Sequence, residues 1–283
     1  MDNETKIAWD EWDTGRKCSE CGRPIRRRKL KQECSFMGVR LEADIECQCV
    51  SERKERIKRE NIEKGRKIIR DSMLKNTGLL SRWQRKTFDN FIVREDQISA
   101  YDPCKRFADT FVLDTHQNGL ILCGGIGCGK THLAAAITNQ IVLNAPIGDA
   151  EAERVGEQGY YSGAYSPVRF TSTIDLLSNI KATYGKKDDG ESERAIVQKY
   201  QKAPLIILDD LGAEKPTEWT KERLFEIVDY RYSEELPIII TTNRTPKEMM
   251  DSLGMRIYDR IKEMCVLVST AAPSQRKEPN KKF

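Results

Sequence analysis

The sequence has little of what a membrane protein or a secreted protein needs. No apolar run among its 283 residues is long enough to span a bilayer. Near Met1 there is no apolar stretch of the kind that a signal peptide requires. We therefore expect a cytoplasmic protein without membrane contacts. Its nine cysteines would then normally be reduced thiols.

A strong overall charge is also missing. The chain has 48 basic and 44 acidic residues, which leaves a net charge of only +4. This small excess is unevenly spread, and the basic residues crowd toward the N-terminal third. The length is sufficient for one substantial domain and a smaller one.

Cysteine is concentrated at the N-terminus, where five of the nine lie within the first fifty residues. Cys18 and Cys21 form a CxxC knuckle, and Gly22 allows the tight turn after it. Cys47 and Cys49 form a second pair, which we expect on a strand, where alternate side chains share one face. Together these four thiolates predict a Zn²⁺ site. Cys34 is a fifth candidate that could replace Cys47 or Cys49, and unliganded buried thiols are the alternative.

A cluster of eight basic residues surrounds the first cysteine pair. They are Arg16, Lys17, Arg23, Arg26, Arg27, Arg28, Lys29 and Lys31. On a zinc-held hairpin this cluster would neutralise nucleic-acid phosphates. A solvated basic face and a docking patch for an acidic protein are equally compatible with it. Residues 1–15 predict a flexible or partner-docking tail.

The pattern of the whole chain suggests four segments. Residues 1–50 form the zinc-binding module, and residues 51–76 form a charged helix that is too polar for a core and links it to the next domain. Residues 77–276 are expected to form the main domain, and residues 277–283 are expected to be disordered. Residues 145–166 interrupt the alternation of strands and helices, which predicts a surface insertion.

A glycine-rich loop after an apolar run is the central motif. Residues 119–123 predict a strand, and the residues after Thr131 have the composition of a helix, which is the context that defines a P-loop. Glycines let backbone N–H groups surround a phosphate, and the helix N-terminus adds its positive dipole end. Lys130 would reach the β- and γ-phosphates of ATP, and the Thr131 hydroxyl would bind Mg²⁺. The expected nucleotide-binding residues are Gly124, Gly125, Ile126, Gly127, Cys128, Gly129, Lys130, Thr131 and His132.

Two further apolar runs end in polar residues. Residues 205–210 end in Asp209 and Asp210, and residues 237–243 end in Asn243. Unbroken apolar runs are typical of strands buried on both faces of a parallel sheet, and ligands bind at the carboxyl ends of such strands. Asp209 would hold Mg²⁺, and Asp210 would orient or polarise the attacking water. Asn243 would bond the water or the γ-phosphate, although capping the next helix is an alternative. The fold class is therefore α/β, a P-loop nucleotide-binding domain with a central parallel sheet flanked by helices.

With these motifs in hand, the chain resembles the DnaC/DnaI/IstB branch of the AAA+ ATPases. The resemblance covers roughly residues 76–276 and depends on the order and spacing of its motifs. These are residues 124–131 with the following His-Leu-Ala-Ala-Ala-Ile, 208–212, Tyr230-Arg231 before Pro237, Thr242-Asn243, and 253–261.

The resemblance implies a role for each matching residue. Lys130 with Thr131 would be Walker A, Asp209 with Asp210 Walker B, and Asn243 sensor 1. Arg256 matches the position of the arginine finger in this branch, with Arg260 as the nearby alternative. Arg276 would be sensor 2, although Gln275 stands where the family has an aromatic residue.

The function that the resemblance implies is ATP-dependent loading of a hexameric replicative DNA helicase onto single-stranded DNA. Loaders of this type form homo-oligomers when ATP is bound, because the finger acts on the neighbouring subunit. In some of them a zinc-containing N-terminal region contacts the helicase. An IstB-like helper of a transposase is one alternative. A DNA-binding zinc protein whose ATP site is a non-hydrolysing switch is another.

Overall fold

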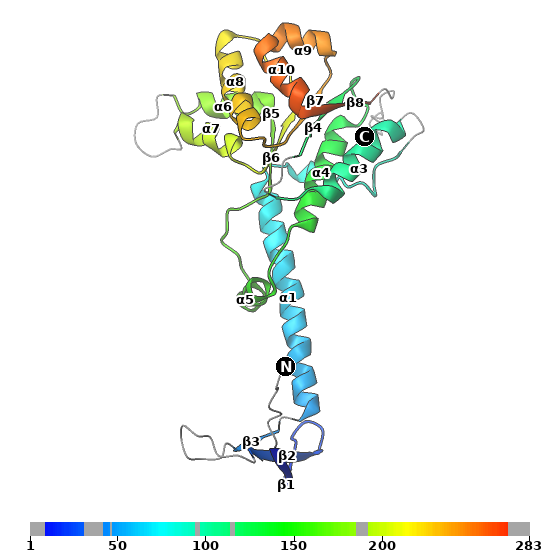
Figure 1. Cartoon of the computed structure of the whole chain (residues 1–283), viewed down its shortest axis with the longest axis vertical. Coiled ribbons are helices and arrows are strands. Elements are labelled where there is room, and N and C mark those ends of the chain that lie inside the picture. Colours follow the sequence, from blue (N-terminus) through cyan, green and yellow to red (C-terminus); the bar gives the residue numbers. More distant parts are fainter. Residues whose placement is uncertain are drawn as a thin grey trace, which may run out of the picture. The chain divides into compact units, whose positions relative to one another are not determined.

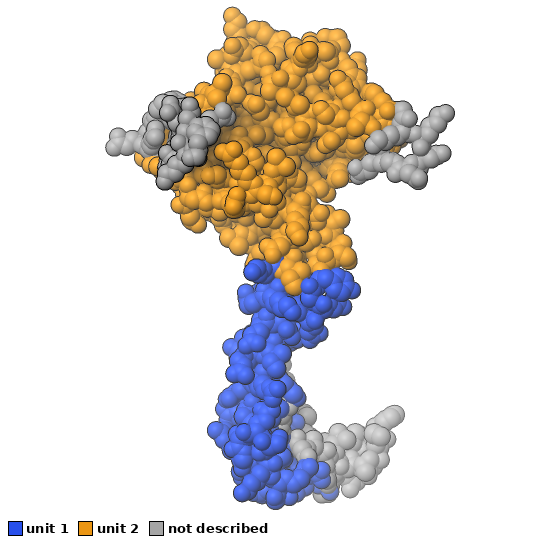
Figure 2. Space-filling view, turned by 180° about the vertical axis from the view of Figure 1, so that it is seen from behind, with its two compact units in different colours: residues 1–67, 148–160 blue, residues 68–147, 161–283 orange. Residues whose placement is uncertain are grey.

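The computed structural model describes residues 9–30, 42–45, 47–93, 97–113, 117–184 and 192–270 (Figure 1). The chain divides into two compact units, which Figure 2 shows in different colours. The smaller consists of residues 1–67 with 148–160, and the larger of residues 68–147 with 161–283. Among the described residues, no helix combines the length and the apolar character that crossing a bilayer demands.

A parallel sheet forms the centre of the larger unit. Within the described residues it has five strands in the order β5-β6-β7-β4-β8. Their bounds are β4 Gly119–Cys123, β5 Val168–Ser172, β6 Leu205–Asp209, β7 Ile238–Thr242 and β8 Cys265–Ser269. Strands β6 and β7 are the two apolar runs that the sequence singles out. The prediction of an α/β fold around a parallel sheet is confirmed.

Helices cover both faces of this sheet (Figure 1). Alternate residues of a strand point to opposite faces, so Leu120 and Leu122 of β4 join one core cluster and Ile121 joins the other. The first cluster also contains residues of α3 and α4, and the second contains residues of α6 to α10. The helices are α2 Ser81–Gln84, α3 Ile98–Thr110, α4 Lys130–Asn144, α6 Thr173–Lys181, α7 Glu193–Gln201, α8 Glu218–Ser233, α9 Pro246–Leu253 and α10 Met255–Met264.

A buried arginine holds the residues that precede β6 and β7, the two strands that end in Asp209 and next to Asn243. Arg231 of α8 has no exposed surface. Its guanidinium donates to five backbone carbonyls, those of Tyr200, Gln201, Ala203, Pro204 and Pro237. Because burying a cation is costly unless it is hydrogen-bonded, the five bonds of its two terminal nitrogens link the residues before β6 and β7 to α8, while the buried Nε has no partner among the described residues.

In the smaller unit, a three-stranded antiparallel sheet forms from the described residues. Its strands are β1 Trp9–Lys17, β2 Pro24–Leu30 and β3 Glu42–Asp44, in that order. From residue 9 onward the prediction of a flexible tail is therefore wrong, and the alternative, a partner-docking segment, stays a prediction. Acidic residues of β1 stand opposite basic residues of β2, in the pairs Asp10 with Lys29, Glu11 with Arg28, and Asp13 with Arg26. Opposite charges across strands stabilise such a sheet, so polarity alone did not indicate disorder.

The charged helix α1, Gln48–Asn76, matches the helix expected over residues 51–76. The insertion after α4 contains a second helix of the smaller unit, α5, Asp149–Gln158. The two helices are in very close contact. A Cβ atom on Gly65 would lie 1.7 Å from the carbonyl oxygen of Ala152, and one on Gly156 would lie 1.9 Å from that of Asn61. The insertion is thus an ordered element that packs on α1.

Two ion pairs flank the contact between α1 and α5. Lys58 pairs with Glu153 at 3.5 Å, and Arg66 pairs with Asp149 at 2.5 Å. Exposed pairs of this kind add little stability by themselves, so the backbone approach at the glycines is the main determinant of the packing.

Candidate nucleotide site and zinc site

The P-loop connects β4 to α4, at the carboxyl edge of the parallel sheet. Gly127 and Gly129 have φ angles of 83° and 101°, a region that favours glycine. Glycine is also required at 129 for space, because a Cβ atom there would lie 2.8 Å from the ring of Phe91. The loop has this shape because its sequence places glycine where backbone and packing both need it.

Lys130 is the first residue of α4, and its side chain is folded back over the loop. It is 7% exposed. Its ammonium donates to the carbonyl oxygens of Gly124 at 2.8 Å and Gly125 at 2.7 Å, and to Oδ1 of Asn243 at 2.7 Å. The cation is therefore held over the loop at the ends of β4 and β7, where phosphate oxygens would replace neutral acceptors.

Asp209, at the end of β6, faces the first turn of α4. Its Oδ1 accepts a hydrogen bond from the Thr131 hydroxyl at 3.0 Å and another from the Thr241 hydroxyl at 2.6 Å. Burial raises the pKa of this carboxyl above its usual value, and the two hydroxyl donors oppose that shift. Asp209 and Thr131 are thus adjacent, as two ligands of one Mg²⁺ must be.

Asp210 and Asn243 are joined by a hydrogen bond at the same edge. The Asn243 amide nitrogen donates to Oδ1 of Asp210 at 2.8 Å, while its oxygen accepts from Lys130. Asp210 has a φ of 58°, a left-handed conformation that non-glycine residues rarely adopt. One amide therefore links the P-loop lysine to the second carboxylate.

The other expected loop residues lie as follows. Ile126 is 67% exposed, whereas Cys128 is fully buried with its sulfur 2.9 Å from the Thr270 hydroxyl. The His132 ring packs edge-on against Phe91 at 5.0 Å, and its Nε2 lies 3.1 Å from the carbonyl oxygen of Thr87. Burial lowers the pKa of His132 below its usual value. Cys128 and His132 thus pack against the protein, whereas the Ile126 side chain is exposed.

Sequence reasoning missed the segment that covers this loop. The buried Gln97 amide donates to the carbonyl oxygen of Cys128 at 2.9 Å. Phe91, from the same region, fills the space beside Gly129. The phenylalanines near residue 90 indicated a core but not this contact, and no local pattern marks Gln97.

The structure does not bring the late arginines to the loop. Arg256 is exposed and has no ion pair among the described residues. Arg260 forms an ion pair with Asp229 at 2.6 Å, and its guanidinium lies 4.9 Å from the ring centroid of Phe225. Arg276, the expected sensor 2, lies outside the described residues. Of the two finger candidates, Arg256 is the more exposed.

The four predicted zinc ligands converge in the smaller unit. Their sulfur atoms all lie within 4.8 Å of one another. The distances are 3.5 Å from Cys18 to Cys49, 3.4 Å from Cys21 to Cys47, and 3.4 Å from Cys47 to Cys49. A tetrahedral zinc with bonds of about 2.3 Å separates its sulfurs by about 3.8 Å, so the four thiols fit that ion.

The knuckle around these thiols is built from backbone bonds. The Gly22 amide donates to the Cys18 carbonyl at 2.9 Å, and Gly22 has a φ of 71°. Backbone N–H groups of Cys21 and Glu20 lower the pKa of Cys18 to about 7, which favours the thiolate that a metal needs.

The expected strand for the second cysteine pair was wrong. Cys47 directly precedes α1, and Cys49 lies in the first turn of that helix. The charged helix begins at Gln48. The sulfurs of Cys47 and Cys49, at the start of this helix, both lie close to those of Cys18 and Cys21. Cys34, the fifth candidate, lies outside the described residues.

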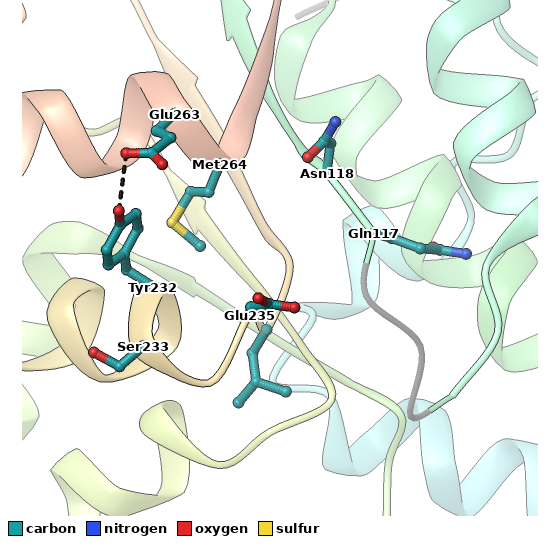
Figure 3. Close-up of a pocket in the computed structure, with 8 residues that line it drawn as sticks. Gln117, Asn118, Tyr232, Ser233, Glu235, Glu263 and Met264 are labelled. Carbon is teal, nitrogen blue, oxygen red and sulfur yellow. Dashed lines mark hydrogen bonds between the residues drawn. The ribbon is translucent and has the colours of Figure 1, made fainter.

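A pocket of about 430 Å³ lies in the larger unit, at a different place from the P-loop (Figure 3). It is lined by residues that precede β4 and β7, such as Asn118 and Leu236, and by the ends of α8 and α10. The Tyr232 hydroxyl donates to Glu263 at 2.9 Å beside it. Because parallel strands bind ligands at their carboxyl ends, this pocket at the amino ends is not part of the nucleotide site.

Comparison with known proteins gives the same class as the geometry. Residues 152–282 match the family described as IstB-like ATP binding protein, and residues 83–152 match the bacterial DnaA ATPase domain. A parallel sheet with a P-loop after β4, paired carboxylates after β6 and an amide after β7 defines the same architecture. The larger unit thus has the AAA+ P-loop fold, and its sequence is similar to the ATP-binding domains of IstB and DnaA.

Within that class, the chain is homologous to the DnaC helicase loaders. The replicative helicase loader DnaC of Escherichia coli (strain K12) is 27% identical over 187 residues, which is 66% of this chain and 66% of that protein. The chain therefore spans just under two thirds of that relative. DnaC of Buchnera aphidicola subsp. Acyrthosiphon pisum is 25% identical over 214 residues.

Solved structures agree with these relatives. The crystal structure of the DnaC helicase loader superposes with a TM-score of 0.53 and 25% identity, covering 67% of this chain and 99% of that one. The DnaI structure has a TM-score of 0.52 and 22% identity over 70% of this chain and 94% of that one, which supports the fold alone. The resemblance stated from the sequence is confirmed.

Proposed function

We propose that this protein is an ATP-hydrolysing loader of a hexameric replicative DNA helicase. The observation that carries the proposal is the linked set of Lys130, Asn243 and Asp210 at the sheet edge, in a domain homologous to DnaC. A phosphate-binding cation and a water-orienting carboxylate joined by one amide serve hydrolysis, and binding alone needs only the first.

The roles of the site residues follow from their positions. Lys130 and the loop amides bind and orient the phosphates of ATP. Mg²⁺, when bound, neutralises phosphate charge, and Thr131 and Asp209 are the residues that would hold it. Asp210 orients the attacking water, and Asn243 keeps that carboxylate in place.

The complete site would form between subunits. Arg256 is exposed and lies on a different helix from the P-loop, so we assign it as the finger that a neighbouring copy supplies when ATP is bound. A homo-oligomer is therefore part of the proposal. Hydrolysis would be slow in the isolated chain because this cation is missing there.

The N-terminal unit would hold zinc and bind the helicase. Its charge favours a protein over DNA as its partner, since residues 1–47 contain ten acidic and ten basic residues. Single-stranded DNA would instead be bound by the ATPase domain, as the resemblance implies. We retain 1–50, 51–76, 77–276 and 277–283 as the proposed segments, and the cytoplasm as the proposed location.

The deciding experiment measures delivery of a purified hexameric replicative helicase to single-stranded DNA coated with single-strand-binding protein. The full chain with ATP should increase the DNA-bound helicase, and Lys130→Ala should not. No delivery together with capture of a transposase would favour the IstB-like alternative. Delivery that needs ATP without phosphate release would favour the nucleotide switch.

A further inference from the structure

A buried hydroxyl on β7 connects the two carboxylates of the nucleotide site. Thr241 is 1% exposed. Its hydroxyl donates to Oδ1 of Asp209 at 2.6 Å and accepts from the backbone N–H of Asp210 at 2.9 Å. A hydroxyl can donate one hydrogen bond and accept others through its lone pairs. Thr241 therefore donates to one Walker B residue, Asp209, and accepts from the other, Asp210.

The bond to Asp209 matters because the other donor to the same oxygen has a second task. Thr131 also donates to Oδ1 of Asp209, at 3.0 Å. A Walker A hydroxyl that binds Mg²⁺ turns its oxygen toward the metal. A hydroxyl that binds a metal through a lone pair keeps its proton, so Thr131 would serve both Mg²⁺ and Asp209, whereas Thr241 serves only the two carboxylate residues. The other oxygen of Asp209, Oδ2, accepts no hydrogen bond from the described residues.

The bond to Asp210 matters because of that residue's backbone. A left-handed φ of 58° costs about 1 kcal/mol or more in a non-glycine residue, so it must be held by its surroundings. The Asp210 N–H would lose its acceptor without Thr241, and the carboxylate would keep only its bond from Asn243.

We infer that Thr241 is a positioning residue that sets the orientation of both Walker B carboxylates. It acts through Asp209 and Asp210 and needs no contact with the nucleotide. The inference deepens the proposed hydrolysis and rests on it.

The neighbouring threonine is a matched control. Thr242 is equally buried, on the same strand, and its hydroxyl donates to the carbonyl of Leu211 at 2.7 Å and accepts from the N–H of Arg244 at 3.1 Å. It therefore supports the loop after β6 without touching either carboxylate. Valine at 241 or 242 keeps the side-chain shape and removes only the hydroxyl.

The test compares Thr241→Val, Thr241→Ser and Thr242→Val in the full chain. Thr241→Val should lower kcat about 10- to 100-fold, the usual effect of removing a partner of a metal ligand. The KM for ATP, and ATP binding measured without Mg²⁺, should stay within about twofold, because the P-loop is untouched. The Mg²⁺ concentration that half-saturates binding of a non-hydrolysable ATP analogue should rise about tenfold.

Recovery by the conservative variant separates positioning from packing. Thr241→Ser keeps the hydroxyl and should restore the Mg²⁺ midpoint to within about threefold of the parent chain. An unchanged midpoint and kcat in Thr241→Val would overturn the inference, and so would an equal shift in Thr242→Val. If the parent chain itself releases no phosphate, the proposed function fails, whereas the Mg²⁺ midpoint still tests the inference.

Discussion

The ammonium of Lys130 and the amide oxygen of Asn243 lie 2.7 Å apart, so the P-loop and the end of β7 are joined by a charge-assisted hydrogen bond. The same ammonium donates to two loop carbonyls. These neutral acceptors are what a triphosphate would exchange for anionic ones.

Replacing this lysine should therefore remove nucleotide binding and turnover together. Lys130→Ala loses a charged contact worth about 1.5–3 kcal/mol, so ATP affinity should fall at least about tenfold. Fluorescent-nucleotide titration and phosphate release measure the two effects. Lys202→Ala, at an exposed position after α7, is the matched control. Turnover that survives in Lys130→Ala would show that ATP is hydrolysed elsewhere.

Asp210→Asn should separate binding from chemistry. The amide keeps the size of the side chain and removes the charge that orients water, so turnover should fall about 100-fold or more. ATP affinity should change by less than about threefold, because Lys130 and the loop remain. A variant that bound ATP poorly would show that Asp210 supports the fold of the site. Single-turnover phosphate release on preloaded protein measures the chemical step directly.

Substitution of the two arginines of α10 should have different effects, on turnover for Arg256 and on stability for Arg260. Arg256→Ala should reduce turnover of the assembled protein about 10³-fold with an unchanged melting temperature, because its side chain is exposed. Arg260→Ala should lower stability by about 1 kcal/mol, since it loses Asp229 and the ring of Phe225.

Mixing two inactive variants tests whether the finger acts between subunits. Arg256→Ala retains an intact P-loop, and Lys130→Ala retains an intact finger. A mixture of them should recover activity that neither shows alone, because one subunit completes the site of the other. No recovery, in a mixture shown to co-assemble, would place Arg256 outside the reaction.

Zinc should copurify at about one equivalent per chain. Cys18→Ser should lose the metal, because three thiolates hold it more weakly than four and Cys18 lies against Cys49. Cys104→Ala removes a buried thiol of α3 and should leave the zinc content unchanged. Metal analysis of folded samples decides between them. Less than about half an equivalent in the parent protein would exclude the site.

The contact between α1 and α5 should not tolerate a side chain. Gly65→Leu places carbon atoms where the Ala152 carbonyl lies, and overpacking of this kind costs about 1–3 kcal/mol or separates the helices. Amides of residues 149–158 should then exchange with deuterium faster. Gly148→Ser is the control, since nothing lies within 4 Å of a Cβ there and serine is a favoured helix cap. Equal exchange in both variants would show that α5 does not depend on α1.

Much of the nucleotide site could be predicted because its motifs are local in sequence. Each polar group directly follows a strand that its own apolar run indicates, and parallel strands bring their carboxyl ends together. Thr241 and Gln97 could not be found this way. Their importance comes from partners that are distant in the sequence, and a threonine within a strand looks like an ordinary strand residue.

The errors concern elements whose stability comes from pairing. In sequence, β1 looks like a polar tail. In the structure, its acidic residues stand opposite basic residues of β2, and this pairing stabilises the strand. Strand β8 was not predicted, because as an edge strand it buries only Cys265 and Val268 and leaves Val266 and Leu267 half exposed. Helix α5 is polar in sequence, and the two glycines that let it approach α1 lie on different helices.

The acidic side chains of β1 neutralise the basic side chains opposite them on β2. Arg26 already lies 3.7 Å from a carboxylate oxygen of Glu11, so dissolved ions screen attractions inside the sheet as well as those to a bound macromolecule. A high-salt wash is the usual way to remove adventitious polyanions from a purified protein. It would therefore also weaken the charge pairs between β1 and β2. Competition with excess unlabelled ligand at low ionic strength is the cleaner way to rank what docks there.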